Sequence, residues 1–140
     1  MKTLIRNGRV ITPDSTINGY ILYQDGVITE IGAGECSCEA DEVIDAHGHY
    51  VSPGFIDIHT HGAGGADFMD GTVEAFLTAS RMQASHGATL VFPTTLTSSN
   101  EVLFDTFETY EKALEANTDG AAFGGLHLEG PYFNPKQAGA

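Results

Sequence analysis

In the first 52 residues, short apolar runs are broken by polar residues and glycines at the spacing typical of β-strands. The runs are "TLIRNGRVI", "GYILYQDGVITEIG" and "DEVIDAHGHYV". Asp25 and Gly26 interrupt the second run, and this pair predicts a β-hairpin, because both central residues of a type I′ turn need a positive φ. We therefore predict that residues 1–52 form an all-β region.

From residue 53 the pattern changes to strands that alternate with helices. The strands are "GFIDIHT", "ATLVFPTT" and "GAAFGGLHLEG". The first helix is "TVEAFLTASRMQASHG", opened by Thr72 as its N-cap, and a second helix begins where Ser98 and Glu101 are spaced as a capping box. Apolar residues at helical spacing predict the buried face of this second helix, namely Leu103, Phe107, Tyr110 and Leu114.

The ends of the three strands recur about every 35 residues, near His59, Pro93 and Glu129, and this spacing is typical of βαβ units. Since the crossover connections of such units are right-handed, consecutive strands run parallel. The fold class is therefore α/β from residue 53 onward.

Two histidines, His59 and His61, stand at the end of the first of these strands in "PGFIDIHTHGAGG". Residues two apart in a strand point to the same side, so if Ile56 and Ile58 face covering helices, both histidines face the opposite side. They also lie at the carboxyl end of the strand, where ligands gather in parallel α/β folds. The alternative is that polar residues simply mark the place where the strand leaves the core.

Glu129 ends the third strand, and the same alternation places it on the inner side of the sheet. Two imidazoles and one carboxylate suit Zn²⁺ or a similar first-row cation. Below them on the same side lie Asp57, which could accept the second N–H of a ligand histidine or serve as a plain interior acceptor, and His127. His127 could support a ligand, contact a substrate or be a satisfied interior histidine. His47 and His49 are read as loop residues, and His86 as the end of a helix.

The composition narrows the possible partners. Lys and Arg total 6 against 19 Asp and Glu, which gives a net charge of −13 in 140 residues, so nucleic acid and anionic membrane surfaces are excluded as expected partners. We find neither a signal-peptide pattern nor an apolar run long enough to span a bilayer. Cys36 and Cys38 are too few for a disulfide framework and are expected to be reduced thiols. A cytoplasmic location is expected.

Four segments carry a resemblance to a known family. "PGFIDIHTHG" resembles the first-strand signature of the amidohydrolase superfamily, and "GLHLEGPYFNPKQAGA" resembles the H-L-E-G-P segment of N-acetylglucosamine-6-phosphate deacetylases. "HGAGGADFMDGT" and "GATLVFPTTLTS" are similar to the same family, so the resemblance covers essentially the whole chain. It implies a metal-dependent hydrolase that removes the acetyl group of N-acetylglucosamine 6-phosphate to give glucosamine 6-phosphate and acetate.

The resemblance also implies a (β/α)₈ TIM-barrel with a small β-sandwich domain beside it. Residues 1–52 would be the N-terminal part of the sandwich, and residues 53–140 would supply the first three strands and two helices of the barrel. A barrel of this kind needs about 250 residues. The chain is therefore expected to be the N-terminal portion of a longer enzyme, inactive alone and homo-oligomeric, as a dimer, when complete.

For the site, the resemblance implies that His59 and His61 hold one metal and that Glu129 is a ligand of the main site. One or two ions are expected, Zn²⁺ first, with Fe²⁺, Mn²⁺ or Co²⁺ as alternatives. Ala140 would contact the phosphorylated amino sugar through its backbone, and the catalytic aspartate would lie beyond it. Two rivals stay open, a dihydroorotase- or hydantoinase-like enzyme acting on a cyclic amide and a non-catalytic fragment. Glu129 in "HLEGP" argues against the first of these.

Overall fold

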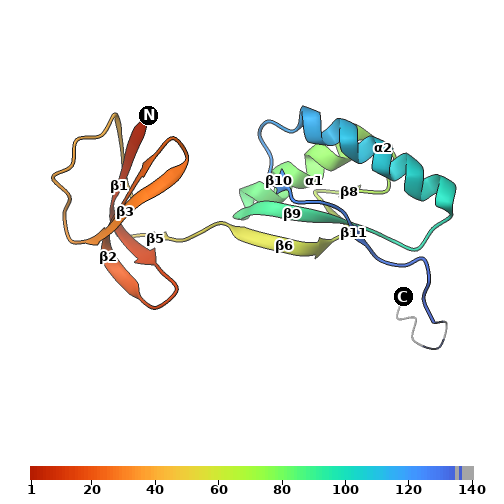
Figure 1. Ribbon diagram of the computed structural model, residues 1–140, viewed down its shortest axis with the longest axis horizontal. Helices are drawn as coiled ribbons and strands as arrows, with labels where there is room; N and C mark the ends of the chain where they lie inside the picture. The colour runs from red at the N-terminus through yellow and green to blue at the C-terminus, as the bar shows by residue number, and fades with distance from the viewer. Residues whose placement is uncertain (135, 137–140) are drawn as a thin grey trace. The chain divides into compact units, whose positions relative to one another are not determined.

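The structure is a computed structural model that describes residues 1–134 and residue 136. The chain divides into two compact units, Met1–Pro53 and Gly54–Ala140, one residue after the boundary expected from the sequence. Figure 1 shows strands in the first unit and both strands and helices in the second. Each unit is described below by itself. None of the described helices is both long and apolar enough to cross a membrane.

Unit 1 is an all-β sheet, as predicted. Its strands are β1 (Lys2–Ile11), β2 (Thr16–Gln24), β3 (Val27–Ala33), β4 (Glu42–Asp45) and β5 (Tyr50–Val51). The sheet order is β3-β2-β1-β4, and β5 also pairs with β1. The hairpin between β2 and β3 turns at Asp25 and Gly26, whose φ angles of 51° and 82° are those that a type I′ turn requires. The predicted hairpin is confirmed.

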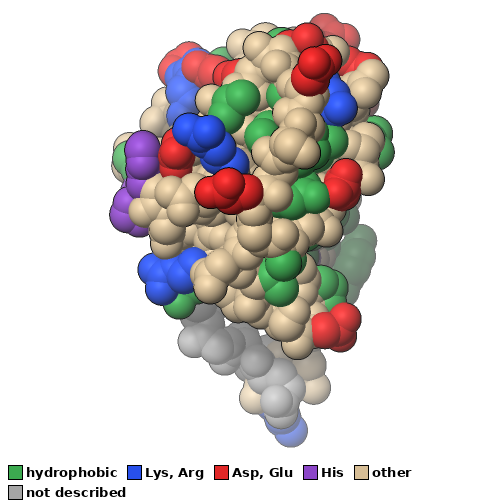
Figure 2. Space-filling model, turned by 90° about the vertical axis from the view of Figure 1, so that its left-hand side faces the viewer, with side chains coloured by type: hydrophobic (Ala, Val, Ile, Leu, Met, Phe, Trp, Pro, Cys, Tyr) green, Lys and Arg blue, Asp and Glu red, His purple; other side chains and the backbone are tan. Residues whose placement is uncertain are grey.

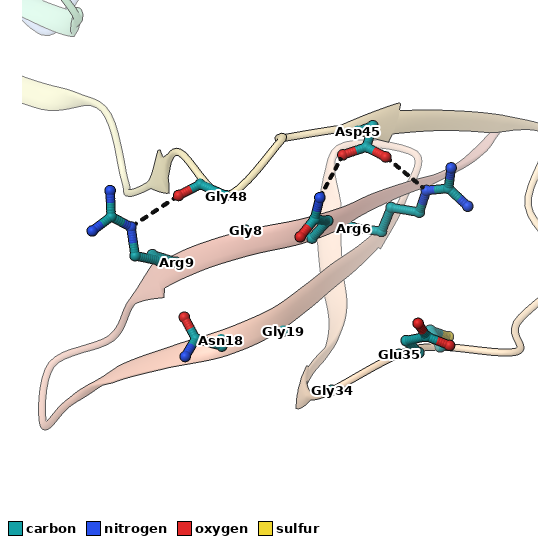
Figure 3. A pocket seen from close by; sticks show the side chains of 11 residues that line it. Arg6, Gly8, Arg9, Asn18, Gly19, Gly34, Glu35, Asp45 and Gly48 are labelled. Carbon is teal, nitrogen blue, oxygen red and sulfur yellow. Dashed lines mark hydrogen bonds and ion pairs between the residues drawn. The ribbon is translucent and has the colours of Figure 1, made fainter.

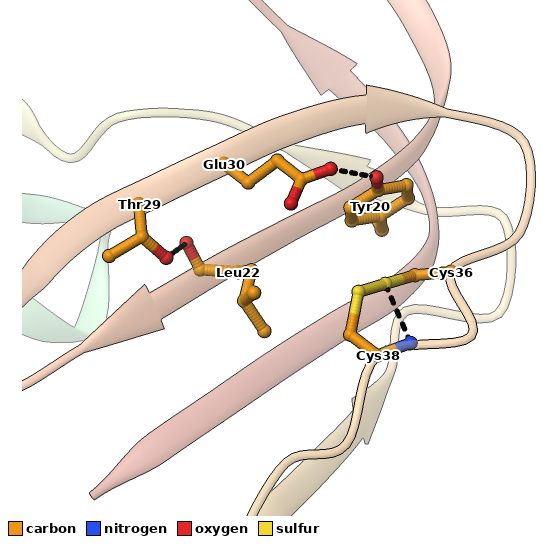
Figure 4. Close-up of a disulfide and its surroundings, with 6 residues drawn as sticks. All are labelled: Tyr20, Leu22, Thr29, Glu30, Cys36 and Cys38. Atoms are coloured by element: carbon orange, nitrogen blue, oxygen red, sulfur yellow. Dashed lines mark hydrogen bonds between the residues drawn. A yellow bond between two sulfur atoms is a disulfide. The ribbon is translucent and has the colours of Figure 1, made fainter.

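A small apolar cluster of Leu4, Tyr20 and Leu22 is covered by the loop that carries the two cysteines. Figure 4 shows Cys36 and Cys38 joined by a disulfide beside Tyr20 and Leu22. The expectation of reduced thiols is therefore wrong in this structure. The loop turns sharply enough to bring the two Cα atoms to 5.3 Å, a separation that a disulfide can bridge, and sequence spacing alone does not reveal such a turn.

Other apolar side chains of unit 1 remain exposed. On β3 and β4 these are Val27, Ile28, Ile31, Val43 and Ile44. Figure 2 shows hydrophobic side chains beside acidic and basic ones on the face that it presents. Apolar surface of this extent is usually covered by another layer of structure.

Unit 2 contains the predicted parallel sheet. β6 (Phe55–Thr60) pairs with β9 (Ala88–Thr95), and β10 (Ala122–Phe123) and β11 (His127–Leu128) pair with the other edge of β9, all in parallel. α1 (Val73–Ser85) connects β6 to β9, and α2 (Asn100–Ala116) connects β9 to β10. A short antiparallel pair, β7 (Gly62–Ala63) and β8 (Ala66–Asp67), lies between β6 and α1. The α/β class is confirmed.

The helices begin at side-chain caps. The hydroxyl of Thr72 accepts a hydrogen bond from the backbone N–H of Ala75, as predicted for α1. The N-cap of α2 is Ser99, whose hydroxyl accepts from Val102, and not the predicted Ser98. With this start Glu101 lies in the first turn of α2, where a negative charge still interacts favourably with the helix dipole.

The helices and the sheet enclose an aromatic core. Phe76 of α1 is fully buried, and its ring centroid lies 5.1 Å from that of Phe68, 5.9 Å from that of Phe123 and 6.0 Å from that of Tyr110. On α2 the buried residues are Leu103, Thr106, Thr109 and Ala113. The predicted buried face is therefore only partly correct. Leu114 is 44% exposed, whereas the smaller residue Ala113 packs into the core with Phe76 and Ala79 of α1.

The third predicted strand is interrupted at Gly124 and Gly125. β10 ends before this pair and β11 begins after it, and Gly125 has a φ of 141°. Any side chain at Gly124 would meet the Phe92 ring at 2.5 Å, so the close approach of β9 requires glycine. The alternation of sides is not carried across this break, since Phe123 packs against Phe76 and Tyr110 on the helix side.

Candidate metal centre

The side chains of His59, His61 and Glu129 converge at the carboxyl ends of β6 and β11. Nε2 of His59 lies 3.1 Å from Oε2 of Glu129, and Nε2 of His61 lies 3.2 Å from the same oxygen. One ligand atom from each residue can be chosen so that all three lie within 4.8 Å of one another. Figure 1 shows β6, β9 and β11 side by side in the sheet that supports them. The structure thus brings together the three residues that the sequence singled out as ligands.

The hydrogen bonding of His61 tests whether a cation fits this group. Nδ1 of His61 lies 3.2 Å from the carbonyl oxygen of Thr94, and a carbonyl can only accept, so Nδ1 carries the proton. In the neutral ring, Nε2 is then an acceptor that faces the Glu129 carboxylate, itself an acceptor. Two facing acceptors require a positive charge, either a proton on Nε2 or a cation held between them.

The distances between the donor atoms agree with a cation held between them. Zn–N and Zn–O bonds of about 2.0–2.1 Å in a tetrahedral site place neighbouring ligand atoms about 3.3 Å apart. The two distances from Glu129 Oε2 to the imidazole nitrogens, 3.1 and 3.2 Å, are close to this value. The donor set is also the kind that first-row divalent cations prefer. The residues present fit a metal ion.

The end of β6 departs from a regular strand where it carries the histidines. Its ladder to β9 shifts register between Asp57 and Thr60. After the shift Thr60 pairs with Pro93, and its backbone N–H donates to the hydroxyl of Thr94, at 3.0 Å. Ile56 and Ile58 are 61% and 65% exposed, so the expectation that they face covering helices is not met within the described residues.

His127 and Asp57 lie next to the ligand group without joining it. Nδ1 of His127 donates to the carbonyl oxygen of Ile58 at 2.7 Å, and its ring centroid lies 4.6 Å from that of His59, at 80° between the planes. Asp57 accepts from the backbone N–H of His59 at 3.1 Å and lies 3.5 Å from the amide nitrogen of Gln83 on α1. These partners of Asp57 are a backbone group and a helix side chain, which agrees with a plain acceptor, the second of the two roles that the sequence left open.

The remaining predicted residues lie elsewhere. His47 and His49 are exposed residues of unit 1, and His86 caps α1 with Nδ1 2.9 Å from the Met82 carbonyl oxygen. Ala140, which the resemblance assigns to substrate binding, lies outside the described residues.

Two threonines that the sequence analysis missed also contact the group. Thr94 meets both Thr60 and His61, and the hydroxyl of Thr97 donates to the carbonyl oxygen of Glu129 at 3.4 Å. The run of hydroxyl residues in "PTTLTS", at the carboxyl end of a strand, is the signal that could have identified them.

Unit 1 has a separate hollow of about 630 Å³ beside the irregular part of β1 (Figure 3). Three of its charged residues, Arg6, Arg9 and Asp45, are engaged within the unit. Nε of Arg6 lies 3.3 Å from Asp45, and Nε of Arg9 donates to the carbonyl oxygen of Gly48 at 2.9 Å. The backbone N–H of His47, and next the Asn7 side chain, hold the pKa of Asp45 below its usual value. The hollow therefore pairs most of its own charges and offers no group of converging acids, bases or nucleophiles among the described residues.

Comparison with known proteins agrees with this geometry. The profile of the amidohydrolase family matches residues 42–101. The chain is 34% identical to N-acetylglucosamine-6-phosphate deacetylase of Bacillus subtilis over 98% of its own length and 36% of that protein. It superposes on the crystal structure of the same enzyme from Pasteurella multocida with a TM-score of 0.85 and 27% identity, over 97% of this chain and 36% of the other. A dihydroorotase of Trichlorobacter lovleyi is 43% identical over a shorter stretch, 44% of this chain and 15% of that protein.

The parallel sheet, the His-His-Glu group and these matches place the chain among the amidohydrolases. Within that class it is similar over nearly its whole length to the N-acetylglucosamine-6-phosphate deacetylases, and the resemblance read from the sequence is confirmed. The chain spans about a third of the length of the deacetylases that it matches.

Proposed function

We propose that this chain contributes to a metal-dependent hydrolase that removes the acetyl group of N-acetylglucosamine 6-phosphate. Water is added across the amide bond, so that the acetyl carbon gains a hydroxyl, the nitrogen gains a proton, and acetate and glucosamine 6-phosphate are released. The observation that carries this proposal is the convergence of His59, His61 and Glu129, with Glu129 inside the "HLEGPYFNP" segment that resembles the deacetylases.

In this proposal His59, His61 and Glu129 hold Zn²⁺, or Fe²⁺, Mn²⁺ or Co²⁺, which accept the same ligands, as one ion or as part of a two-ion site. A divalent cation there polarises the acetamide carbonyl and lowers the pKa of a water molecule toward neutrality. The protein's own part is to fix two imidazoles and one carboxylate around a single point. The carboxylate also offsets part of the positive charge of the ion.

The glycine-rich segment after His61 forms one wall of the proposed site. The backbone N–H of Phe68 donates to the carbonyl oxygen of His61 at 2.9 Å, and the buried ring of Phe68 anchors the segment in the core. Gly64 and Gly65, at the turn between β7 and β8, have φ angles of 65° and 83°. These positive φ angles favour glycine, and a Cβ at Gly64 would lie 3.4 Å from Thr78 and Met82 of α1, so the turn packs closely on that helix.

We also propose that His127 holds the ring of His59 in place. It bonds to the backbone beside His59 and packs edge-on against that ring. The variant His127→Phe keeps an aromatic ring but cannot donate to Ile58, and we expect it to weaken metal affinity about tenfold. Competition with a chelator on the full-length protein measures this, with His49→Phe in the exposed loop of unit 1 as the control. Equal affinities for His127→Phe and the wild type would refute the role.

The fold and assembly expected from the resemblance also remain proposals. We propose that the sheet of unit 2 is part of a (β/α)₈ barrel and that the sheet of unit 1 is part of a β-sandwich. The exposed apolar side chains on β3, β4 and β6 support both. We further propose a cytoplasmic homodimer, and the net charge of −13 argues against nucleic acid or anionic membranes as partners. A crystal structure and sedimentation analysis of the full-length protein test these proposals, and an open sheet or a monomer would contradict them.

The substrate proposal predicts a strong preference for the phosphorylated sugar. Contacts to a remote phosphate supply binding energy that positions the amide, so acetate release from N-acetylglucosamine 6-phosphate should exceed that from N-acetylglucosamine by at least about tenfold in kcat/KM. Acetate release by the full-length protein measures this. Dihydroorotate and a hydantoin serve as alternative substrates, because the match to a dihydroorotase favours a cyclic amide as the second candidate. Faster turnover of either ring would overturn the proposal, and turnover of no substrate would favour a non-catalytic role.

A further inference from the structure

Thr94 of β9 lies between the two strands that carry the proposed ligands. Its side chain is fully buried. On one side it meets β6, where its hydroxyl accepts from the backbone N–H of Thr60 at 3.0 Å and its carbonyl oxygen accepts from Nδ1 of His61 at 3.2 Å. On the other side it is the register partner of His127 on β11, two residues before Glu129. One residue thus contacts the ligand His61 and pairs with the strand that leads to Glu129.

The hydroxyl of Thr94 adds a side-chain bond between β6 and β9 where their ladder shifts register. Where β6 shifts register, the Thr60 N–H donates to a side chain of the neighbouring strand, and that hydroxyl in turn donates to the carbonyl oxygen of Phe92 at 3.1 Å. A hydroxyl can accept from one group and donate to another, so Thr94 satisfies Thr60 and keeps its own proton bonded. The end of β6, and with it His61, is held at a fixed distance from β9.

The carbonyl oxygen of Thr94 determines which tautomer the neutral ring of His61 adopts. Because it accepts from Nδ1, it holds the neutral ring in the form whose Nε2 lone pair points to Glu129. Partners of this kind orient a ligand histidine and raise its affinity for a metal.

We propose that Thr94 is a positioning residue of the metal centre: its hydroxyl fixes the end of β6, and its carbonyl fixes the ring form of His61. The inference rests on the proposed function, because it assumes that the His-His-Glu group binds a metal.

The test compares three variants of the full-length protein. Thr94→Val removes the hydroxyl and keeps the side-chain shape, and Thr94→Ser keeps the hydroxyl. Thr106→Val is the matched control, because Thr106 is also buried and its hydroxyl donates to the Val102 carbonyl oxygen within α2. Each protein is stripped of metal and titrated with Co²⁺, whose visible absorption reports the geometry of its ligands, and affinity is measured against a chelator.

We expect Thr94→Val to bind Co²⁺ about 10- to 100-fold more weakly than the wild type, with a changed absorption spectrum. Thr94→Ser and Thr106→Val should keep the wild-type spectrum and nearly the wild-type affinity. A Thr94→Val protein with wild-type affinity and spectrum would overturn the inference while leaving the metal site standing. An equal loss in Thr106→Val would also overturn it, because the effect would then be general destabilisation. Failure of the wild type to bind Co²⁺ would instead overturn the proposed function, and the inference with it.

If Thr94→Val does not fold, a measurement on the wild type still tests the inference. The Thr60 N–H, which donates to the hydroxyl of Thr94, should exchange with solvent as slowly as the ladder amides of β9. Hydrogen exchange of the metal-free protein, followed residue by residue, reads this directly. Rapid exchange at Thr60 would show that the hydroxyl of Thr94 does not hold the end of β6.

Discussion

Replacing Glu129 by glutamine is expected to strip the full-length protein of most of its metal and nearly all of its acetate release. Oε2 of Glu129 is the atom that lies within 3.2 Å of both imidazole nitrogens, and a neutral amide oxygen is a much weaker ligand for a divalent cation than a carboxylate. Loss of a direct ligand should lower metal affinity by at least about 100-fold, since loss of a mere supporting partner costs 10- to 100-fold. Elemental analysis of the purified variant, together with an acetate assay, measures both effects.

Two further variants test whether the loss of metal is specific to the ligand Glu129. Glu108→Gln makes the same change on an exposed position of α2 and should keep the wild-type metal content. His59→Asn should lose less metal than Glu129→Gln, because His61 and Glu129 still lie 3.2 Å apart. Wild-type metal content in Glu129→Gln would show that the group is not a metal site.

The second large effect concerns stability. Phe76→Ala is expected to lower the free energy of unfolding by about 3–5 kcal/mol, the usual cost of truncating a buried phenylalanine. The side chain of Phe76 is fully buried at the centre of the aromatic core, where Phe68, Tyr110 and Phe123 surround it. Removal of the Phe76 ring leaves a cavity that the surrounding rings cannot fill without moving. Urea denaturation followed by circular dichroism measures the change.

Phe104→Ala is the control for this experiment. It removes the same side chain from α2, but Phe104 is 61% exposed, so the expected change is within about 0.5 kcal/mol. Similar losses in the two variants would mean that the aromatic cluster around Phe76 is not the core that stabilises unit 2.

The sequence was sufficient to predict that His59, His61 and Glu129 converge, because each stands at the carboxyl end of a strand of one parallel sheet. His59 and His61 are two residues apart at a strand end, and Glu129 lies at the end of a strand that pairs with the same neighbour. In a parallel sheet such ends lie along one edge, whatever the details of packing. The hairpin at Asp25 and Gly26 and the cap at Thr72 were predictable because each depends on a few neighbouring residues.

The features that the sequence did not reveal depend on contacts between distant residues. The break at Gly124 and Gly125 lies where the Phe92 ring comes close, and the shifted register of β6 accompanies a hydrogen bond to a hydroxyl on β9. The face of α2 was misjudged because small residues such as Ala113 pack against α1. Hydrophobicity alone ranks such residues below Leu114, which the structure leaves partly exposed.

The glycine break also separates the packing of the core from the position of Glu129, which a continuous strand would couple. Before it, Phe123 belongs to the packing of α1 and α2, and after it, Glu129 belongs to the chemistry of the site. In an unbroken strand, a shift that accommodates a new core side chain would pass along the rigid backbone to the ligand. The glycine pair absorbs such a shift in its own torsion angles. The core of unit 2 can therefore diversify during evolution, or be redesigned for stability, while the position of the carboxylate is conserved.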